Sequence, residues 1–126
     1  MRLFSLGPRL SAAAELARGA HSIIDVGSDH ARLPVWLLSR GLINRAYAAD
    51  ISPCSVEKAE RAARKYELSD RLFAVLSDGL SEFRAEDADT IILAGLGGDV
   101  IASILKGAPW VADGSTNSGK SRSAEG

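Results

Sequence analysis

The sequence of 126 residues has few of the residues that build disulfides and metal sites. Cys54 is the single cysteine, so no internal disulfide can form. Because His21 and His30 are the only histidines, we expect no zinc site and no structural metal. Lysine and arginine (15) nearly balance aspartate and glutamate (16), and the formal net charge of -1 gives no electrostatic argument for nucleic acid, although a local basic patch stays open.

Long hydrophobic runs are also absent from the sequence. No apolar stretch reaches the length of a membrane span, and the first 20 residues lack the continuous hydrophobic centre of a secretory signal. We therefore expect a cytoplasmic protein with no membrane contact. The composition that remains, 46% hydrophobic and 25% charged residues, is ordinary for one soluble globular domain.

The most informative stretch is an apolar run that stops at an acid and a glycine. Ile23, Ile24 and Val26 are β-branched, which is typical of a strand covered on both faces in a parallel sheet. The loop that follows leads into a predicted helix over 31–40. A strand, a glycine loop and a helix form the opening unit of a doubly wound α/β domain, in which ligands bind beyond the carboxyl ends of the strands.

The same alternation recurs along the chain. Strands are predicted over 45–51, 72–76 and 88–94, and helices over 6–17, from Ser52 or Ser55 to Tyr66, and from Asp99 through Leu105. We therefore predict an α/β domain over 1–110, a parallel sheet of about four strands with flanking helices. Residues 111–126 are small, polar and charged, so they cannot bury much apolar surface and are predicted to be a disordered tail.

Acids and glycines follow every predicted strand, and in a parallel sheet they should lie along one edge. They are Asp25, Gly27 and Asp29, then Asp50, then Asp78 and Gly79, then Gly95, Gly97 and Gly98. One such site would be explained by the turn residues that strand ends contain anyway. Four in succession favour a ligand site, in which glycines let the backbone approach the ligand and Asp50 accepts hydrogen bonds from ribose hydroxyls.

The loop after the first strand discriminates between nucleotide ligands. A dinucleotide fingerprint has glycines where this chain has Asp29 and Arg32, and a carboxylate at the first of these positions would repel a pyrophosphate. NAD and FAD are therefore disfavoured. S-adenosylmethionine has no phosphate, carries an ammonium and a sulfonium group, and still offers a ribose to Asp50, so it is the ligand that the acids favour.

Four blocks of sequence carry a resemblance to a known family. They are Asp25-Val-Gly-Ser-Asp-His-Ala31 with Leu33-Pro34, then Ala49-Asp-Ile51, Asp78-Gly79-Leu80 and Ala94-Gly-Leu-Gly-Gly98. Together they resemble the bacterial tRNA adenine-N1 methyltransferases that act on the D-loop region. The resemblance spans about residues 6–107. It implies a Rossmann-like class I methyltransferase core, S-adenosylmethionine as the methyl donor and tRNA as the acceptor.

The resemblance also implies roles for individual residues. The loop of Asp25, Gly27, Ser28, Asp29 and His30 would hold the methionine part of the donor, Asp50 with the adjacent Ile51 its ribose side, Asp78 and Gly79 the adenine side, and Gly95, Gly97 and Gly98 the place where donor and target base meet. Methylated adenine is cationic, so a nearby carboxylate could stabilise the developing charge, and Asp29 and Asp99 are the candidates. His30 could equally be a structural hydrogen-bonding residue.

The chain also departs from that family. Its members continue after the fourth strand and its helix, so we expect a truncated sheet whose fourth strand has an open edge that could bind a partner. Two other functions therefore stay open: a catalytically inactive fragment that binds S-adenosylmethionine, and a Rossmann-like domain that binds a partner chain. Lys58, Arg61 and Lys65 could contact tRNA, but glutamates interleaved with them in the sequence favour a solvated helix face.

Overall fold

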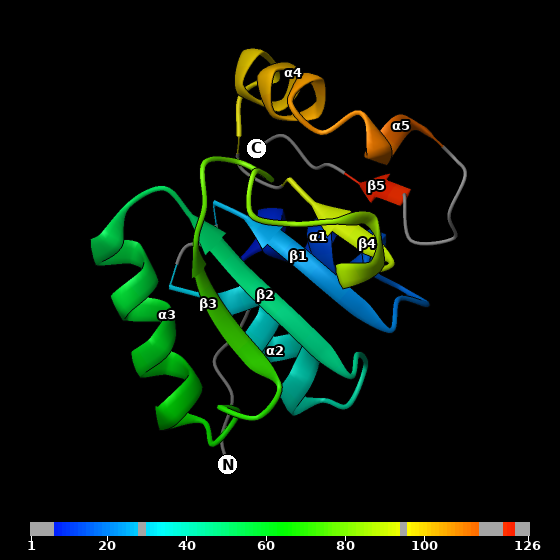
Figure 1. Cartoon of the computed structure of the whole chain (residues 1–126). Coiled ribbons are helices and arrows are strands. Elements are labelled where there is room, and N and C mark those ends of the chain that lie inside the picture. The colour runs from blue at the N-terminus through cyan, green and yellow to red at the C-terminus, as the bar shows by residue number, and fades with distance from the viewer. Residues whose placement is uncertain (1–6, 28–29, 94–95, 114–119, 123–126) are drawn as a thin grey trace.

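The computed structural model describes residues 7–27, 30–93, 96–113 and 120–122 (Figure 1). Its elements are α1 (Pro8–Leu16), β1 (Ser22–Val26), α2 (Arg32–Ser39), β2 (Arg45–Asp50), α3 (Pro53–Lys65), β3 (Leu72–Leu76), the single-turn helix η1 (Ala85–Asp87), β4 (Thr90–Ile92), α4 (Gly98–Lys106), α5 (Trp110–Asp113) and β5 (Lys120–Arg122). The predicted alternation of helices and strands is confirmed as far as α4. None of the helices in these ranges combines the length and apolar character of a membrane span.

The described strands form one parallel sheet in the order β3-β2-β1-β4-β5. The chain adds β2 and β3 on one side of β1 and then returns to place β4 on the other side (Figure 1). This reversal leaves a crevice beyond the carboxyl ends of β1 and β4, because the connections that leave these two strands run in opposite directions.

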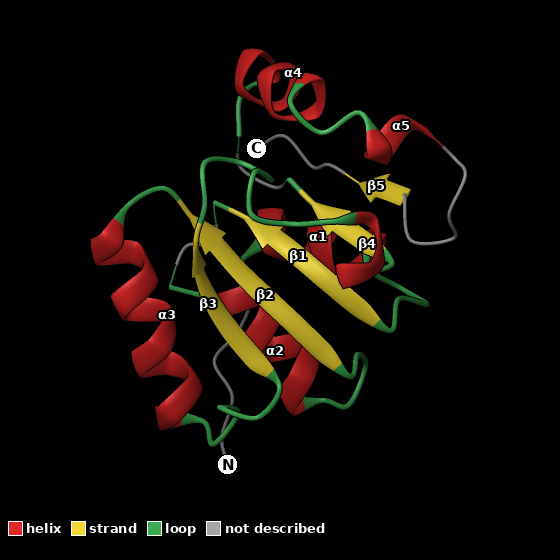
Figure 2. Ribbon diagram, viewed as in Figure 1, coloured by secondary structure: helices red, strands yellow, loops and turns green. Residues whose placement is uncertain are grey.

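Side chains of the sheet alternate between two cores. Ile23 and Ile92 belong to the core under α1, α2 and α3, whereas Ile24 and Ile91 belong to the core on the opposite face. The central strands are therefore apolar on both faces, as the β-branched run predicts. Figure 2 shows α1 and α2 behind the sheet and α3 beside β3, with α4 and α5 on the side of β4 and β5.

The segment predicted to be a disordered tail is partly ordered. Residues 110–113 form α5, and Lys120 to Arg122 form β5, which pairs in parallel with β4 through Thr90 opposite Lys120. The expectation of an open β4 edge is therefore wrong over 90–92. An edge strand is held by main-chain hydrogen bonds, so it needs few apolar side chains, and composition does not reveal it. Residues 114–119 and 123–126 lie outside the described residues.

The helix α3 ends in a compact main-chain motif. The N–H of Leu68 donates to the carbonyl of Ala63 at 2.7 Å, and the N–H of Glu67 donates to the carbonyl of Arg64 at 3.2 Å. These two bonds define a Schellman motif, whose left-handed position usually holds glycine. Here it is Glu67, with φ of 57°, so this helix end carries backbone strain.

A carboxylate joins the amino ends of β1 and β4. Asp89 Oδ2 accepts a hydrogen bond from the His21 N–H at 2.8 Å, and Asp89 N–H donates to Ser22 Oγ at 3.2 Å. The two central strands are thereby held in register at the end opposite the crevice.

Candidate functional site

A cavity of about 570 Å³ lies beyond the carboxyl ends of β1, β2 and β3 and is bordered by α4. Its lining residues are Val26, Gly27, Asp50, Ile51, Ser77, Asp78, Gly79, Leu96, Asp99, Val100, Ser103 and Ile104. Six of the residues predicted from the sequence are thus brought together: Gly27, Asp50, Ile51, Asp78, Gly79 and Asp99. The cavity occupies the place where doubly wound sheets bind ligands, and its volume is in the range of small-molecule sites.

Asp50 is held in place by the start of the following helix. The N–H of Ser52 donates to Asp50 Oδ1 at 2.9 Å, and Ser52 Oγ in turn accepts a hydrogen bond from the Ser55 N–H at 3.5 Å. Ser52 is the N-cap of α3, so the same short segment begins the helix and orients the carboxylate. Because this bond holds one carboxylate oxygen, the other can accept hydrogen bonds from a ligand.

Two glycines let the loops and the α4 segment pack closely. Gly27 has φ of +73°, and a Cβ added there would lie 3.0 Å from Cδ2 of Leu96. Gly79 has φ of +63°, and a Cβ there would lie 3.1 Å from Cγ1 of Ile104. Both positions therefore need glycine for the backbone conformation and for the room it leaves. The sequence predicted glycine for the approach of a ligand, whereas in the structure both glycines also make room for the opposite wall.

The sequence did not identify several residues of the cavity. Ser77 is buried, donates through Oγ to the carbonyl of Gly79 at 2.8 Å, and accepts a hydrogen bond from the Glu82 N–H at 3.4 Å, so it shapes the loop after β3. In the sequence it reads as an ordinary turn residue. Val100, Ser103 and Ile104 form the α4 wall with Asp99. The spacing of these residues from Asp99 along the predicted helix could have indicated this wall in the sequence.

The cavity is acidic and partly apolar. Asp50, Asp78 and Asp99 contribute three carboxylates, and no lysine, arginine or histidine is among the described residues that line it. Ile51 and Val100 keep 67% and 49% of their surface exposed, so the cavity offers apolar faces to a ligand. Such a site suits a cationic ligand with a flat apolar group and is unfavourable for a pyrophosphate. No cluster of three acids, histidines or cysteines in the described ranges could hold a metal ion.

Other residues predicted for the site do not line this cavity. Asp25 is only 5% exposed within β1, so its side chain is part of the sheet interior. Gly97 and Gly98 lie exposed at the start of α4, outside the lining, and His30 belongs to a separate groove. Asp25 is buried because β1 continues one residue beyond it, to Val26. The predicted residues Ser28, Asp29 and Gly95 lie outside the described residues.

The connection from β1 to α2 has an unusual backbone. His30 and Ala31 both have φ of 55°, the left-handed region that residues with a Cβ seldom adopt. Ala31 is fully buried and comes directly before α2. Two consecutive left-handed residues store strain in this connection, and such strain is concentrated at functional sites because the surrounding fold has to hold it.

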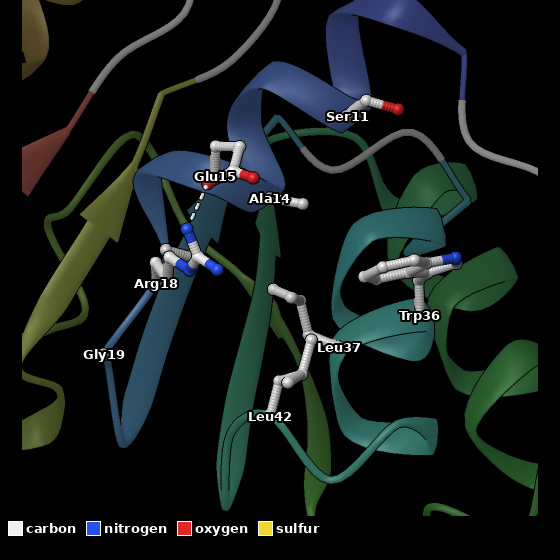
Figure 3. Close-up of a pocket in the computed structure, with 9 residues that line it drawn as sticks. Ser11, Ala14, Glu15, Arg18, Gly19, Trp36, Leu37 and Leu42 are labelled. Atoms are coloured by element: carbon white, nitrogen blue, oxygen red, sulfur yellow. Dashed lines mark hydrogen bonds and ion pairs between the residues drawn. The ribbon is translucent and has the colours of Figure 1, made fainter.

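A different hollow, of about 350 Å³, lies between α1 and α2 (Figure 3). Ala14, Trp36 and Leu42 contribute to its apolar lining, and the ion pair of Arg18 with Glu15 (3.4 Å) lies at its border. It contains none of the residues predicted for the site. Because it lies away from the carboxyl ends of the strands, we do not assign the ligand site to it.

Comparisons of this chain with known proteins give matches that agree with one another. A family model for the methyltransferase domain matches residues 6–117. The tRNA (adenine(22)-N(1))-methyltransferase of Bacillus subtilis (strain 168) is 33% identical over 106 residues, which make up 84% of this chain and 44% of that protein. The structure of M. capricolum TrmK, in complex with the natural cofactor product S-adenosyl-homocysteine, aligns with a TM-score of 0.73 and 33% identity, over 82% of this chain and 47% of that one.

A second solved structure agrees with the first. A Streptococcus pneumoniae protein in complex with S-adenosyl-L-methionine aligns with a TM-score of 0.75 and 35% identity, over 81% of this chain and 48% of that one. The chain therefore spans somewhat less than half the length of these relatives.

Proposed function

The chain belongs to the methyltransferase domain family, and from this premise we propose that it binds S-adenosylmethionine in the acidic cavity and serves methyl transfer to N1 of an adenine in tRNA. The observation that carries the proposal is the set of three carboxylates, Asp50, Asp78 and Asp99, in a cavity with no cation among its described lining residues. S-adenosylmethionine supplies an activated methyl group on a positively charged sulfur. The acceptor is proposed from the similarity to the tRNA methyltransferase of B. subtilis.

The cavity residues fit this cofactor in charge and shape. Asp50 accepts hydrogen bonds from the ribose hydroxyls through the oxygen that Ser52 does not hold. Ile51 and Val100 provide apolar faces for the adenine, whose burial removes apolar surface from water. The carboxylates attract the positively charged groups of the cofactor. This attraction is stronger inside a cavity than in bulk water, because few water molecules separate the charges.

The chemistry of transfer demands positioning more than a strong base. Adenine N1 already has a lone pair, so its attack on the methyl carbon requires alignment of the reacting atoms. The methylated base carries a positive charge. Asp99, in the first turn of α4 and at the cavity, is the described carboxylate that we assign to stabilise this charge. Asp29, the other candidate from the sequence, lies outside the described residues.

Two alternatives predict other outcomes. A catalytically inactive fragment would bind S-adenosylmethionine without transferring the methyl group, and a partner-binding domain would need no cofactor. An oxidoreductase that uses NAD is disfavoured, because three carboxylates would face its pyrophosphate. A tRNA acceptor would place the reaction in the cytoplasm.

The test has a binding step and a transfer step. The purified chain is titrated calorimetrically with S-adenosylhomocysteine and, as a control, with NADH. It is then incubated with tRNA and S-adenosylmethionine labelled in the methyl group, and the digested RNA is analysed for 1-methyladenosine. We expect S-adenosylhomocysteine but not NADH to bind, and the label to appear in 1-methyladenosine.

Each failure has its own meaning. Binding without label in RNA would support the inactive fragment. A folded chain, as judged by circular dichroism, that does not bind S-adenosylhomocysteine would refute the proposal.

A further inference from the structure

A second concave surface lies between the start of α2 and α3. This basic groove, of about 420 Å³, is lined by His30 and Arg32 on one side and by Lys58, Arg61 and Lys65 of α3 on the other, with Tyr66 at its end. The acidic cavity and the basic groove share none of the residues that line them. The described residues thus form two separate surfaces of opposite charge.

The helical period places three of the cations of α3 together. Lys58, Arg61 and Lys65 follow a spacing of three and four residues, which places them on one helix face. Glu60 lies about 160° from Lys58 and about 100° from Arg61, because each residue turns the helix by about 100°. Glu57 lies about 100° from Lys58 but only about 40° from Arg61. Of the interleaved glutamates, which in the sequence favoured a solvated face, Glu60 therefore lies on another face of the helix, whereas Glu57 is placed to pair with Arg61.

Local ion pairing leaves the groove positive. Arg61 Nη2 lies 2.6 Å from Glu57 Oε1, in an ion pair whose two side chains are both largely exposed. The described residues that line the groove include Lys58 and Lys65 and no acid, so the lining stays positive although Arg61 is paired with Glu57. The ammonium of Lys65 lies 5.4 Å from the centroid of the Tyr66 ring, which keeps the side chain beside the groove.

Two chain segments link the basic groove to the proposed donor site. His30 follows directly on the loop that leaves β1, and α3 begins at the segment that orients Asp50. A rise of about 1.5 Å per residue separates Lys58 from Lys65 by about 10 Å along the helix axis. That length corresponds to about three nucleotides of a stacked strand, which rises by about 3.4 Å per nucleotide.

We propose that the basic groove binds the phosphodiester backbone of the RNA acceptor, beside the cavity that binds the methyl donor. The identity of the RNA as tRNA rests on the proposed function. Lys58 and Lys65 act as point charges toward phosphates, and the guanidinium groups of Arg32 and Arg61 add positive charge to the lining. Such contacts position the nucleic acid without reading its sequence.

The test measures affinity and its salt dependence in the complete 126-residue chain. Fluorescence anisotropy with a labelled tRNA transcript is recorded between about 50 and 200 mM salt for the wild type and for Lys58→Gln/Lys65→Gln. We expect the double variant to bind about tenfold more weakly, with the slope of log K against log salt reduced by about 1 to 2. Lys58→Arg/Lys65→Arg should restore wild-type binding.

The matched control removes two cations elsewhere. Arg18→Gln/Arg71→Gln lowers the net charge equally; Arg18 lies in the connection from α1 to β1 and Arg71 directly before β3, both toward the amino ends of the strands and outside the two linings. An equal loss of affinity in this control, or an unchanged salt slope in the lysine variant, would overturn the proposal. So would competition by polyglutamate as effective as that by RNA of equal charge.

Calorimetric titration of the same variants with S-adenosylhomocysteine separates the two proposals. We expect Lys58→Gln/Lys65→Gln to bind it as the wild type does. A wild-type chain that binds tRNA through the groove but not S-adenosylhomocysteine would refute the proposed function and support the groove. A wild-type chain that binds S-adenosylhomocysteine but no tRNA would refute the groove and leave the donor site intact.

Discussion

Replacing Asp50 by asparagine tests the donor site at its best-defined atom. In the structure the Ser52 N–H donates to Asp50 Oδ1 at 2.9 Å, and an asparagine carbonyl can accept the same bond. The start of α3 should therefore survive the substitution. The second carboxylate oxygen, in contrast, becomes an NH2 group, which donates rather than accepts and cannot receive the ribose hydroxyls.

The expected loss follows from the hydrogen bonds removed. A hydrogen bond to a charged group contributes about 1.5 to 3 kcal/mol, and Asp50 is half-buried, so the lower part of this range applies. Since about 1.4 kcal/mol corresponds to a factor of ten, Asp50→Asn should weaken the binding of S-adenosylhomocysteine by about 10- to 30-fold. The free energy of unfolding should change by less than about 0.5 kcal/mol, because the bond to Ser52 is retained.

Calorimetric titration and urea unfolding of the same preparations provide the two readouts. Asp70→Asn serves as the control, because it removes an equal charge from an exposed loop before β3. Binding of S-adenosylhomocysteine by Asp50→Asn within about threefold of the control would refute the assignment of Asp50 to the ribose. A large loss of stability would instead show that the charge itself holds the start of α3.

Three further substitutions test the packing that supports the site. Gly79→Ala should lower the free energy of unfolding by about 1 to 2 kcal/mol, because φ is +63° and the new Cβ would lie 3.1 Å from Cγ1 of Ile104; unchanged urea unfolding would contradict this. Glu67→Gly should raise the free energy of unfolding by about 0.5 to 1 kcal/mol by relieving the left-handed end of α3, whereas Glu67→Ala should not, and an equal effect of both would exclude backbone strain as the cause. Asp89→Ala should lower the melting temperature and reduce the free energy of unfolding by about 1 to 2 kcal/mol, because the N–H groups of His21 and Ser22, 2.8 and 3.5 Å from the carboxylate oxygens, lose their acceptors while the main-chain N–H bond to Ser22 Oγ remains; a loss below about 0.5 kcal/mol would show that the two strands need no such link.

Sequence patterns were sufficient for most of the fold. The β-branched run of β1, the turn residues after each strand and the amphipathic spacing of α3 report on local conformation and burial, which depend mainly on neighbouring residues. The fifth strand could not be predicted in this way. Lys120 to Arg122 pair with β4 through the main chain, and composition carries no information about which backbone a segment will meet.

The candidate site was predictable where it depends on strand ends. Gly27, Asp50 and Asp78 share an edge because parallel strands end on the same side of a sheet, so their order in the sequence was enough. The burial of Asp25 was harder to predict from the sequence, because a shift of one residue at a strand end decides whether a side chain lies in the sheet or in the loop.

The sequence by itself determined the order of the elements, the ligand-facing edge and the acidic character of the site, since these follow from local periodicity and from the residues at strand ends. Tertiary structure alone decided that α4 borders the cavity and that Ser77 shapes the loop after β3, which lines the cavity. It also decided that Arg32 of α2 and Lys58 of α3 line one basic groove. The physical reason is that such surfaces are formed by residues distant in sequence, and their juxtaposition depends on how complete elements pack on the sheet.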